Sequence, residues 1–171
     1  AGIQAPILIM GYTPPDGARL AVDYDLIPSL ITIEFAQALS AQASAAGVTR
    51  AVHVKVDSGM GRYGLMPGEV MEFFTELERL PGISVQGLFT HFATADWADQ
   101  THVRQQLKLF KQVVQDVRQA GFEVPLVHAA SSAATMNLPE AHFNAVRPGV
   151  ALYGLRPSDE WPPVFDLKPA L

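Results

Sequence analysis

The sequence predicts an α/β protein built on a parallel sheet, and more specifically an incomplete (β/α)₈ barrel of about six βα units. Short apolar runs alternate with longer segments of helical periodicity, as strands and helices do in such sheets. The runs are continuously apolar, which is typical of strands buried on both faces. Alternation alone also fits an open doubly wound sheet. Histidines and cations at the ends of successive runs favour the barrel, which assembles its site there.

The expected strands are short apolar runs bounded by turn residues. They lie at residues 6–10, 26–31, 51–56, 83–92, 126–129 and 144–146. The first begins almost at residue 1, and a complete barrel needs about 250 residues. We therefore expect residues 1–171 to form one incomplete barrel domain that lacks the first strands.

Three helices are expected between these strands. Residues 35–46 are rich in alanine and are followed by Gly47 in the C-cap position. Residues 67–80 start with proline, a favourable first residue, and end before another proline. Residues 102–120 carry apolar side chains at spacings of three and four, and Gly121 stops the helix. That apolar stripe consists of Val103, Leu107, Phe110, Val114 and Val117.

Composition narrows the class of protein. With 49% hydrophobic and 17% charged residues, the chain has enough material for one globular domain. Its formal charge of -5 and the lack of a basic stripe argue against nucleic acid as a partner. The absence of cysteine excludes disulfides and thiolate catalysis, and no metal site is expected. No apolar run reaches the roughly 20 residues of a membrane helix, so we expect a soluble, cytoplasmic protein without a membrane partner.

Four successive strand ends carry cationic or imidazole side chains. They are Lys55 together with Arg62, then His91, then His128, then Arg147. Each has a structural explanation when taken singly, because a lysine can extend from a strand end to water and a lone histidine is usually a core residue. The recurrence at neighbouring strand ends instead favours one shared polar pocket. The glycines of residues 59–64 would let backbone approach a ligand there.

Two strand-to-helix turns predict a phosphate group on the ligand. Ser132 follows the strand at 126–129 at the start of an expected helix, where it is either an ordinary N-cap or a phosphate contact. Gly149 and Val150 follow the next strand and could supply two backbone amides. Adjacent turns of this type form the phosphate site of many barrels. The pattern favours a phosphorylated cofactor or substrate.

Four motifs together resemble the ordered motifs of bacterial alanine racemases, and their order and spacing match across nearly the whole chain. They occupy residues 53–62 (His-Val-Lys-Val-Asp-Ser-Gly-Met-Gly-Arg), 87–96, 128–134 and 146–154. The resemblance implies a homodimeric pyridoxal 5'-phosphate (PLP) enzyme with an N-terminal (β/α)₈ barrel and a C-terminal β domain. Such an enzyme interconverts L- and D-alanine for peptidoglycan synthesis.

The resemblance also implies roles for the residues at the strand ends. Lys55 matches a lysine that is carbamylated in many members and would hold Arg62 by a charge-assisted contact. Arg62 would face the phenolic oxygen of PLP and the substrate carboxylate. His91 would lie against the pyridine ring.

The remaining matched residues would bind the other parts of PLP. Arg147 matches the arginine that donates to the pyridine nitrogen, and His128 would orient it. Ser132 and the amides of Gly149 and Val150 would hold the phosphate.

Two parts of the family's machinery have no counterpart in the sequence. These are the lysine that forms the Schiff base with PLP and a tyrosine from the second domain of the partner subunit. The lysines present are Lys55, Lys108, Lys111 and Lys168, and the expected helix places Lys108 and Lys111 on its polar face. We expect the second domain to start near residues 167–169, and residues 1–171 alone to be unable to racemise alanine.

Several alternatives stay open. The chain could come from a broad-specificity or serine racemase of the same fold, or be a truncated module that binds without catalysis. A decarboxylase of the fold group is disfavoured, because those enzymes usually place Glu where Arg147 stands. The sequence also departs from the common family pattern at Ser58, where Thr is usual, at Tyr63, where Leu is common, and at Ser131, where many members have Asn.

Overall fold

The computed structural model describes residues 2–160 and 168 and shows five parallel strands with helices between them. The strands are β1 (Ile7–Ile9), β2 (Leu26–Leu30), β3 (Arg50–Lys55), β4 (Ile83–Phe89) and β5 (Leu126–His128). The α-helices are α1 (Ala18–Asp23), α2 (Ile33–Ala45), α3 (Val70–Leu77), α4 (Thr101–Gln119) and α5 (Ser132–Asn137). Short 3₁₀ turns are η1 (Pro15–Gly17), η2 (Pro67–Glu69), η3 (Pro139–Ala141) and η4 (Val150–Tyr153). The expected start of a second domain, near 167–169, lies outside the described residues except for Lys168.

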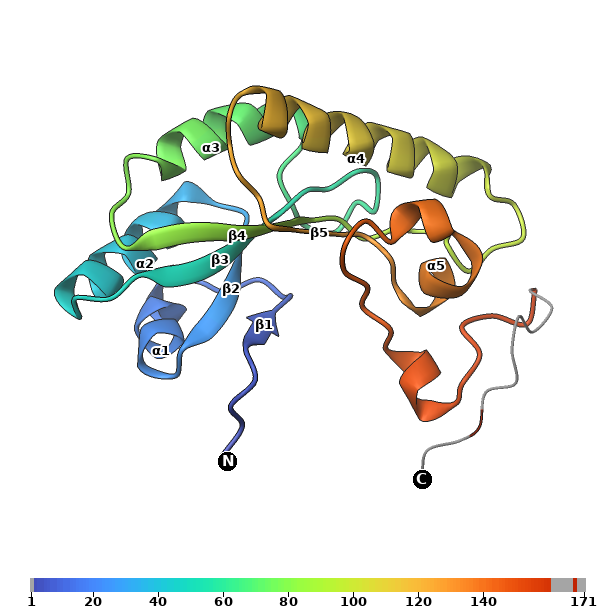
Figure 1. The fold of residues 1–171 in the computed structure, drawn as a ribbon, viewed down its shortest axis with the longest axis horizontal. Coiled ribbons are helices and arrows are strands. Elements are labelled where there is room, and N and C mark those ends of the chain that lie inside the picture. Colours follow the sequence, from blue (N-terminus) through green and yellow to red (C-terminus); the bar gives the residue numbers. More distant parts are fainter. Residues whose placement is uncertain (1, 161–167, 169–171) are drawn as a thin grey trace.

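The strand order decides between a barrel and a doubly wound sheet. It runs β1-β2-β3-β4-β5, so each strand pairs in parallel with its neighbour in sequence. A doubly wound sheet reverses this order at a switch point and carries helices on both faces. Here α1 to α4 follow one another along the outside of a curved sheet (Figure 1), and each contacts the next. The described residues therefore form part of a barrel wall, as predicted.

The predicted strands and helices are largely confirmed, with two differences. Residues 144–146 are not a strand, because Ala145 forms only one isolated bridge with His128. The Asn144 side chain takes the place of further ladder bonds: its Oδ1 accepts from the Val127 N–H at 2.7 Å and its Nδ2 donates to the Pro125 carbonyl. Helix α1 was not predicted, since its six residues between Gly17 and Tyr24 are too few to show helical periodicity.

The core lies between the sheet and the outer helices. In β3, Val52 and Val54 are fully buried, while the alternate residues His53 and Lys55 belong to the other face. Helix α4 packs the predicted apolar stripe inward and leaves Lys108 and Lys111 exposed. None of the described helices is long and apolar enough to cross a membrane.

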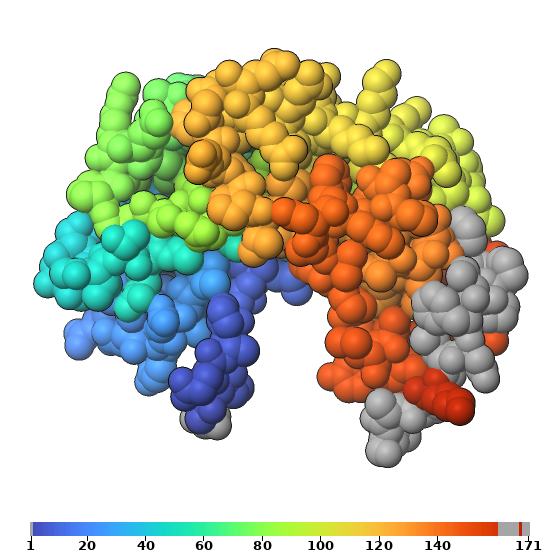
Figure 2. Space-filling model, in the orientation of Figure 1, coloured from blue at the N-terminus to red at the C-terminus, as the bar shows by residue number. Residues whose placement is uncertain are grey.

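The concave side of the curved sheet is open to the surface of the molecule (Figure 2). Figure 2 shows a deep notch between the N-terminal residues, in blue, and the segment coloured orange to red. The carboxyl ends of the strands meet here, and the chain brings the predicted site residues to this region.

Candidate functional site

The loop after β3 is built around Asp57. Its Oδ1 accepts from the backbone N–H of Gly59, Met60 and Gly61 at 2.9, 2.7 and 3.1 Å, and its Oδ2 accepts from Gly61 at 2.9 Å. Burial raises the pKa of this carboxyl, but the three N–H donors outweigh burial and hold the pKa below its usual value. Gly64 closes the loop at a φ of 141°, where a Cβ would lie 2.7 Å from the Asp57 nitrogen. Only glycine fits this turn.

Lys55 ends β3 as a buried cation. Lys55 is 2% exposed, and no described residue accepts a hydrogen bond from its Nζ. Nζ lies 3.2 Å from the centroid of the Tyr63 ring. Burial, followed by the charges of Arg62 and Arg147, lowers the pKa of Lys55 to about 8, while Asp57 opposes the shift.

Arg147 is the second cation of the site, and three of its five N–H donors bind neighbouring residues. One terminal nitrogen donates to Nδ1 of His128 at 2.6 Å. The other donates to the carbonyls of Thr90 at 2.8 Å and Ala129 at 3.2 Å. Burial lowers the pKa of Arg147 to about 10, so it stays protonated at neutral pH. The guanidinium is thus held by neutral acceptors that connect the ends of β4 and β5.

The donor character of Arg147 sets the tautomers of two histidines behind it. Arginine has no acceptor, so Nδ1 of His128 must accept and its proton lies on Nε2. That Nε2–H then donates to Nδ1 of His53 at 2.8 Å. Burial, followed by the charge of Arg147, lowers the pKa of His53 to about 4 and that of His128 to about 3. Both imidazoles are therefore neutral at pH 7.

Gly87 of β4 makes room for this pair of histidines. A Cβ at this position would lie 2.3 Å from Nδ1 of His53 and 2.4 Å from two of its ring carbons. Real Cβ atoms do not approach other atoms so closely, so a larger residue would displace the His53 ring. The Phe89 ring stacks on His128 with centroids 4.8 Å apart and completes the packing.

Ser132 links α5 to the turn that contains Gly149. Its Oγ accepts from the N–H of Gly149 at 2.7 Å and of Ala151 at 3.3 Å. Ser131, rather than Ser132, occupies the N-cap of α5, and its side chain makes no cap hydrogen bond. The Val150 N–H starts η4 and does not bind Ser132. Ser132 therefore contacts this turn through the N–H groups of Gly149 and Ala151, and its role at a phosphate stays a prediction.

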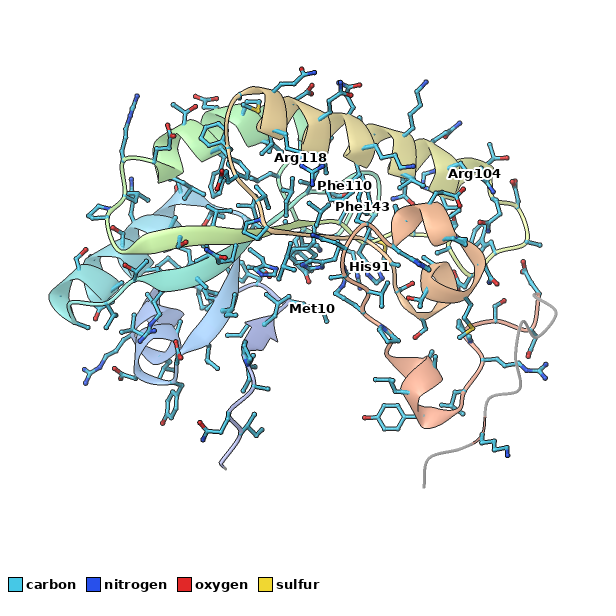
Figure 3. The ribbon with its side chains drawn as sticks, viewed as in Figure 1. Met10, His91, Arg104, Phe110, Arg118 and Phe143 are labelled. Atoms are coloured by element: carbon cyan, nitrogen blue, oxygen red, sulfur yellow. The ribbon has the colours of Figure 1, made fainter. Side chains whose placement is uncertain are left out.

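One cavity of about 430 Å³ brings five of the eight predicted site residues together. These are His91, Ser132, Arg147, Gly149 and Val150. Met10 at the end of β1 and Asp96 also line it. Figure 3 shows His91 and Met10 on the concave side of the sheet, away from Arg104 and Arg118 on α4.

The charges around the cavity are mainly positive. Burial is the largest cause that lowers the pKa of His91 to about 4, followed by the charges of Arg147, Arg62 and Lys55, against which Asp96 acts weakly. A neutral histidine beside several cations suits an anionic ligand that also presents an aromatic or apolar surface.

The other three predicted residues do not line this cavity. Lys55 and His128 are buried behind it. Arg62 is exposed at the tip of the 57–64 loop, and its side chain takes part in no hydrogen bond or ion pair within the part of the chain that the structure describes. Within the same part, no group of three or more His, Asp or Glu side chains could hold a metal ion.

Gln106 is a site-supporting residue that the sequence analysis missed. It is 1% exposed on the buried face of α4, and its Oε1 accepts from the N–H of Ala93, a cavity residue, at 2.9 Å. Its Nε2 lies 3.3 Å from where a Cβ of Gly59 would be. The signal was present, since Gln106 interrupts the stripe between Val103 and Phe110, and a polar residue on a buried face needs a partner.

Comparisons with known proteins agree with this geometry. The family described as alanine racemase, N-terminal domain, matches residues 1–157. The alanine racemase of Desulfovibrio desulfuricans is 44% identical over 171 residues, which cover 100% of this chain and 46% of that relative. The alanine racemase of Desulfosudis oleivorans is 47% identical over 93% of this chain and 43% of its own length. The chain thus spans less than half the length of these relatives.

Solved structures give the same result. Alanine racemase of Clostridium difficile 630 in complex with cycloserine superposes with a TM-score of 0.95 at 36% identity, over 99% of this chain and 47% of that one. Alanine racemase from Bacillus anthracis with bound L-Ala-P superposes with a TM-score of 0.90, also at 36% identity, over 99% of this chain and 44% of that one. The family match, the identity to these relatives and the superposition of the parallel barrel wall agree, and the chain belongs to the alanine racemase family, of which it represents part of the N-terminal domain.

Proposed function

We propose that the intact protein is a PLP-dependent alanine racemase that interconverts L- and D-alanine and supplies D-alanine for peptidoglycan. The observation that carries this proposal is the single cavity in which His91, Ser132, Arg147, Gly149 and Val150 meet. Relatives at 44% and 47% identity are alanine racemases. We further propose that it acts in the cytoplasm as a homodimer, and that residues 1–171 are an incomplete barrel domain of a longer chain.

The cavity fits PLP in size and in the chemistry of its lining. Its volume of about 430 Å³ falls within the usual range for small-molecule sites. At one end the Ser132 Oγ already accepts two N–H bonds, so its O–H is left to donate to a phosphate oxygen. Val150 is the first residue of η4, so the turn itself provides no carbonyl acceptor for the Val150 N–H. This N–H could donate to the phosphate. When bound, PLP would supply the electron sink that makes the α-hydrogen of an amino acid acidic.

Arg147 is suited to hold the pyridine nitrogen without protonating it. An arginine donates hydrogen bonds but does not give up its proton near neutral pH. The bonds to His128, Thr90 and Ala129 fix the guanidinium at the cavity wall. The ring nitrogen would therefore accept a hydrogen bond and stay uncharged. An uncharged ring nitrogen would draw less negative charge from the substrate into the ring. His91, neutral at pH 7, would pack against the ring face.

Arg62 is proposed to serve the substrate side of the site, with Lys55 buried behind it. Arg62 is exposed and extends from a loop whose base is fixed by Asp57, so it can reach a substrate carboxylate. Lys55 could support Arg62 only as an anion, which is the carbamate that the family resemblance implies. As the ammonium described here it adds positive charge instead, and its contact with Tyr63 favours that form.

The described lysines do not offer a base to the cavity. Lys55 is buried against Tyr63, Lys108 and Lys111 lie exposed on the outer face of α4, and Lys168 is exposed and does not line the cavity. Racemisation needs proton transfer on both faces of the α-carbon. We therefore propose that a polypeptide of residues 1–171 alone does not racemise alanine.

The proposal is tested by assaying the intact protein, loaded with PLP, for conversion of L-alanine to D-alanine with a coupled D-amino-acid oxidase assay. We expect turnover of alanine in both directions, little effect of the outer-face variant Arg118→Leu, and no turnover by the 1–171 polypeptide. Serine racemised faster than alanine would instead support the broader or serine-specific alternative. No racemisation of any amino acid by a PLP-loaded protein would overturn the proposal.

A further inference from the structure

Tyr63 connects three parts of the site region. It belongs to the glycine-rich loop after β3, and its hydroxyl donates to the Met10 carbonyl at the end of β1 at 2.6 Å. Its ring faces the Lys55 Nζ, which lies 3.2 Å from the ring centroid. Met10 itself lines the cavity. One side chain therefore ties a buried lysine to the edge strand.

Lys55 has few other sources of stabilisation. Nζ has no hydrogen-bond acceptor among the described residues. The nearby acid, Asp57, directs both oxygens to the N–H groups of its own loop. Because a buried ammonium without a partner is costly, the electron-rich face of the Tyr63 ring is the contact that compensates Lys55.

We propose that Tyr63 is a positioning residue that keeps Lys55 protonated and fixed at the end of β3 through the face of its ring. The hydroxyl contributes by anchoring the ring to Met10. This inference goes beyond the proposed racemase activity and does not depend on it, since it concerns two side chains of this chain without cofactor or substrate.

The charged groups around Lys55 make the role of the ring measurable. Arg62 and Arg147 disfavour its ammonium form, and Asp57 favours it. Burial and these charges already bring the pKa of Lys55 to about 8. Without the ring the balance would shift further toward the neutral amine. The same contact opposes carbamylation, because a carbamate on Nζ would place negative charge on the negative face of the ring.

The test is a pH titration of the Lys55 side chain in the intact protein, followed by NMR of ¹³C-labelled lysine. The Lys55 resonance is identified by its loss in Lys55→Met. Tyr63→Leu removes the ring, and we expect its titration midpoint to fall by about one pH unit, which is about tenfold in the protonation equilibrium. Tyr63→Phe is the matched control, because it keeps the ring and loses only the bond to Met10. Its midpoint should stay within about 0.3 units of the wild type.

A second series keeps the shape of the side chain, so it does not depend on the folding of Tyr63→Leu. Phenylalanine carrying increasing numbers of fluorine atoms at position 63 withdraws electron density from the ring face. We expect the Lys55 midpoint to fall stepwise with fluorination. A midpoint that does not change along the series, or an equal fall in Tyr63→Phe and Tyr63→Leu, would refute the role of the ring. Neither result bears on racemisation, which is assayed separately.

Discussion

The two buried cations of the site, Arg147 and Lys55, are held in opposite ways. Arg147 donates to a histidine nitrogen and two carbonyls, and the bonded His128 is in turn bonded to His53. Lys55 has no hydrogen-bond acceptor among residues 2–160 and 168, and it faces an aromatic ring instead. Burial of a charge therefore serves rigidity at Arg147 and allows a tunable charge state at Lys55.

The difference follows from the geometry of the two donors. A planar guanidinium can bind several fixed carbonyls at once, whereas an ammonium on a flexible stem is a point charge whose pKa shifts readily on burial. Strand ends β4 and β5 offer carbonyls and an imidazole around Arg147, while the loop after β3 uses its one carboxylate, Asp57, for its own backbone. Removal of each cation should therefore have different consequences.

Among the substitutions, the largest effect is expected for Arg147→Leu. The substitution leaves Nδ1 of His128 and two buried carbonyls without donors, and we expect the free energy of unfolding to fall by about 3 kcal/mol. Racemase activity should fall by about 10³-fold, as for loss of a fixed donor in a closed site. Arg147→Lys should recover part of the stability but little activity, because it lacks the two-nitrogen geometry. Urea denaturation and the coupled assay measure both. A loss of stability below about 1 kcal/mol would show that the bonds of Arg147 contribute little to the folded state.

Gly87→Ala tests the packing behind Arg147. The new Cβ would collide with the His53 ring, and overpacking of this kind costs about 2 kcal/mol. The matched control is Gly68→Ala, where nothing lies within 4 Å of the added Cβ, and we expect a change within about 0.5 kcal/mol. Thermal and urea denaturation of both variants provide the measurement. Equal stabilities would mean that His53 can shift freely.

Stability should fall as the pH is lowered from about 6.5 toward 4. His53, His91 and His128 have folded-state pKa values of about 4, 4 and 3, below the unfolded value of 6.5. In this window the unfolded chain binds protons that the folded chain does not, so acid favours unfolding. From these values each histidine contributes about 2 kcal/mol, and we expect the three together to remove about 5 kcal/mol of stability between pH 7 and pH 5. His53→Asn keeps an acceptor for the His128 N–H but removes one titrating group. The free energy of unfolding, measured by urea denaturation, should therefore fall less steeply as the pH is lowered. An unchanged slope would contradict the neutral histidine pair.

Lys55→Met should have the smallest effect, with the opposite sign. Methionine fills a similar volume and removes a buried charge that has no acceptor, so stability should stay equal or rise by up to about 1 kcal/mol. Urea denaturation of Lys55→Met and Arg147→Leu under the same conditions compares the two changes in the free energy of unfolding. A loss above about 2 kcal/mol would show that Lys55 has a stabilising partner in the intact protein.

Much of the fold could be predicted because it depends on local patterns. The spacing of Val103, Leu107 and Phe110 predicts α4, and the apolar run from Ile7 predicts β1. Helix α1 escaped prediction because six residues show too little periodicity. The strand expected at 144–146 failed because Asn144 replaces backbone ladder bonds with side-chain bonds, which no apolar pattern reveals.

The sequence predicts that the candidate site residues meet at the strand ends, and their roles toward cofactor and substrate stay predictions. His91, Ser132 and Arg147 line one cavity, as their places at strand ends suggested. The sequence could not show that Gln106 reaches from α4 to Ala93, or that Gly87 accommodates His53. These contacts join residues far apart in the chain, and their distances depend on how neighbouring strands are staggered.

Local sequence patterns are enough to predict the alternation of strands and helices, the set of cationic residues at the strand ends and the resemblance to alanine racemases. The folded chain is needed to see that Arg147 binds an imidazole and two carbonyls while Lys55 faces the Tyr63 ring, and that both histidines behind Arg147 are neutral. The physical reason is that residue type sets which bonds a side chain can form, whereas burial and the position of distant acceptors set which bonds it does form.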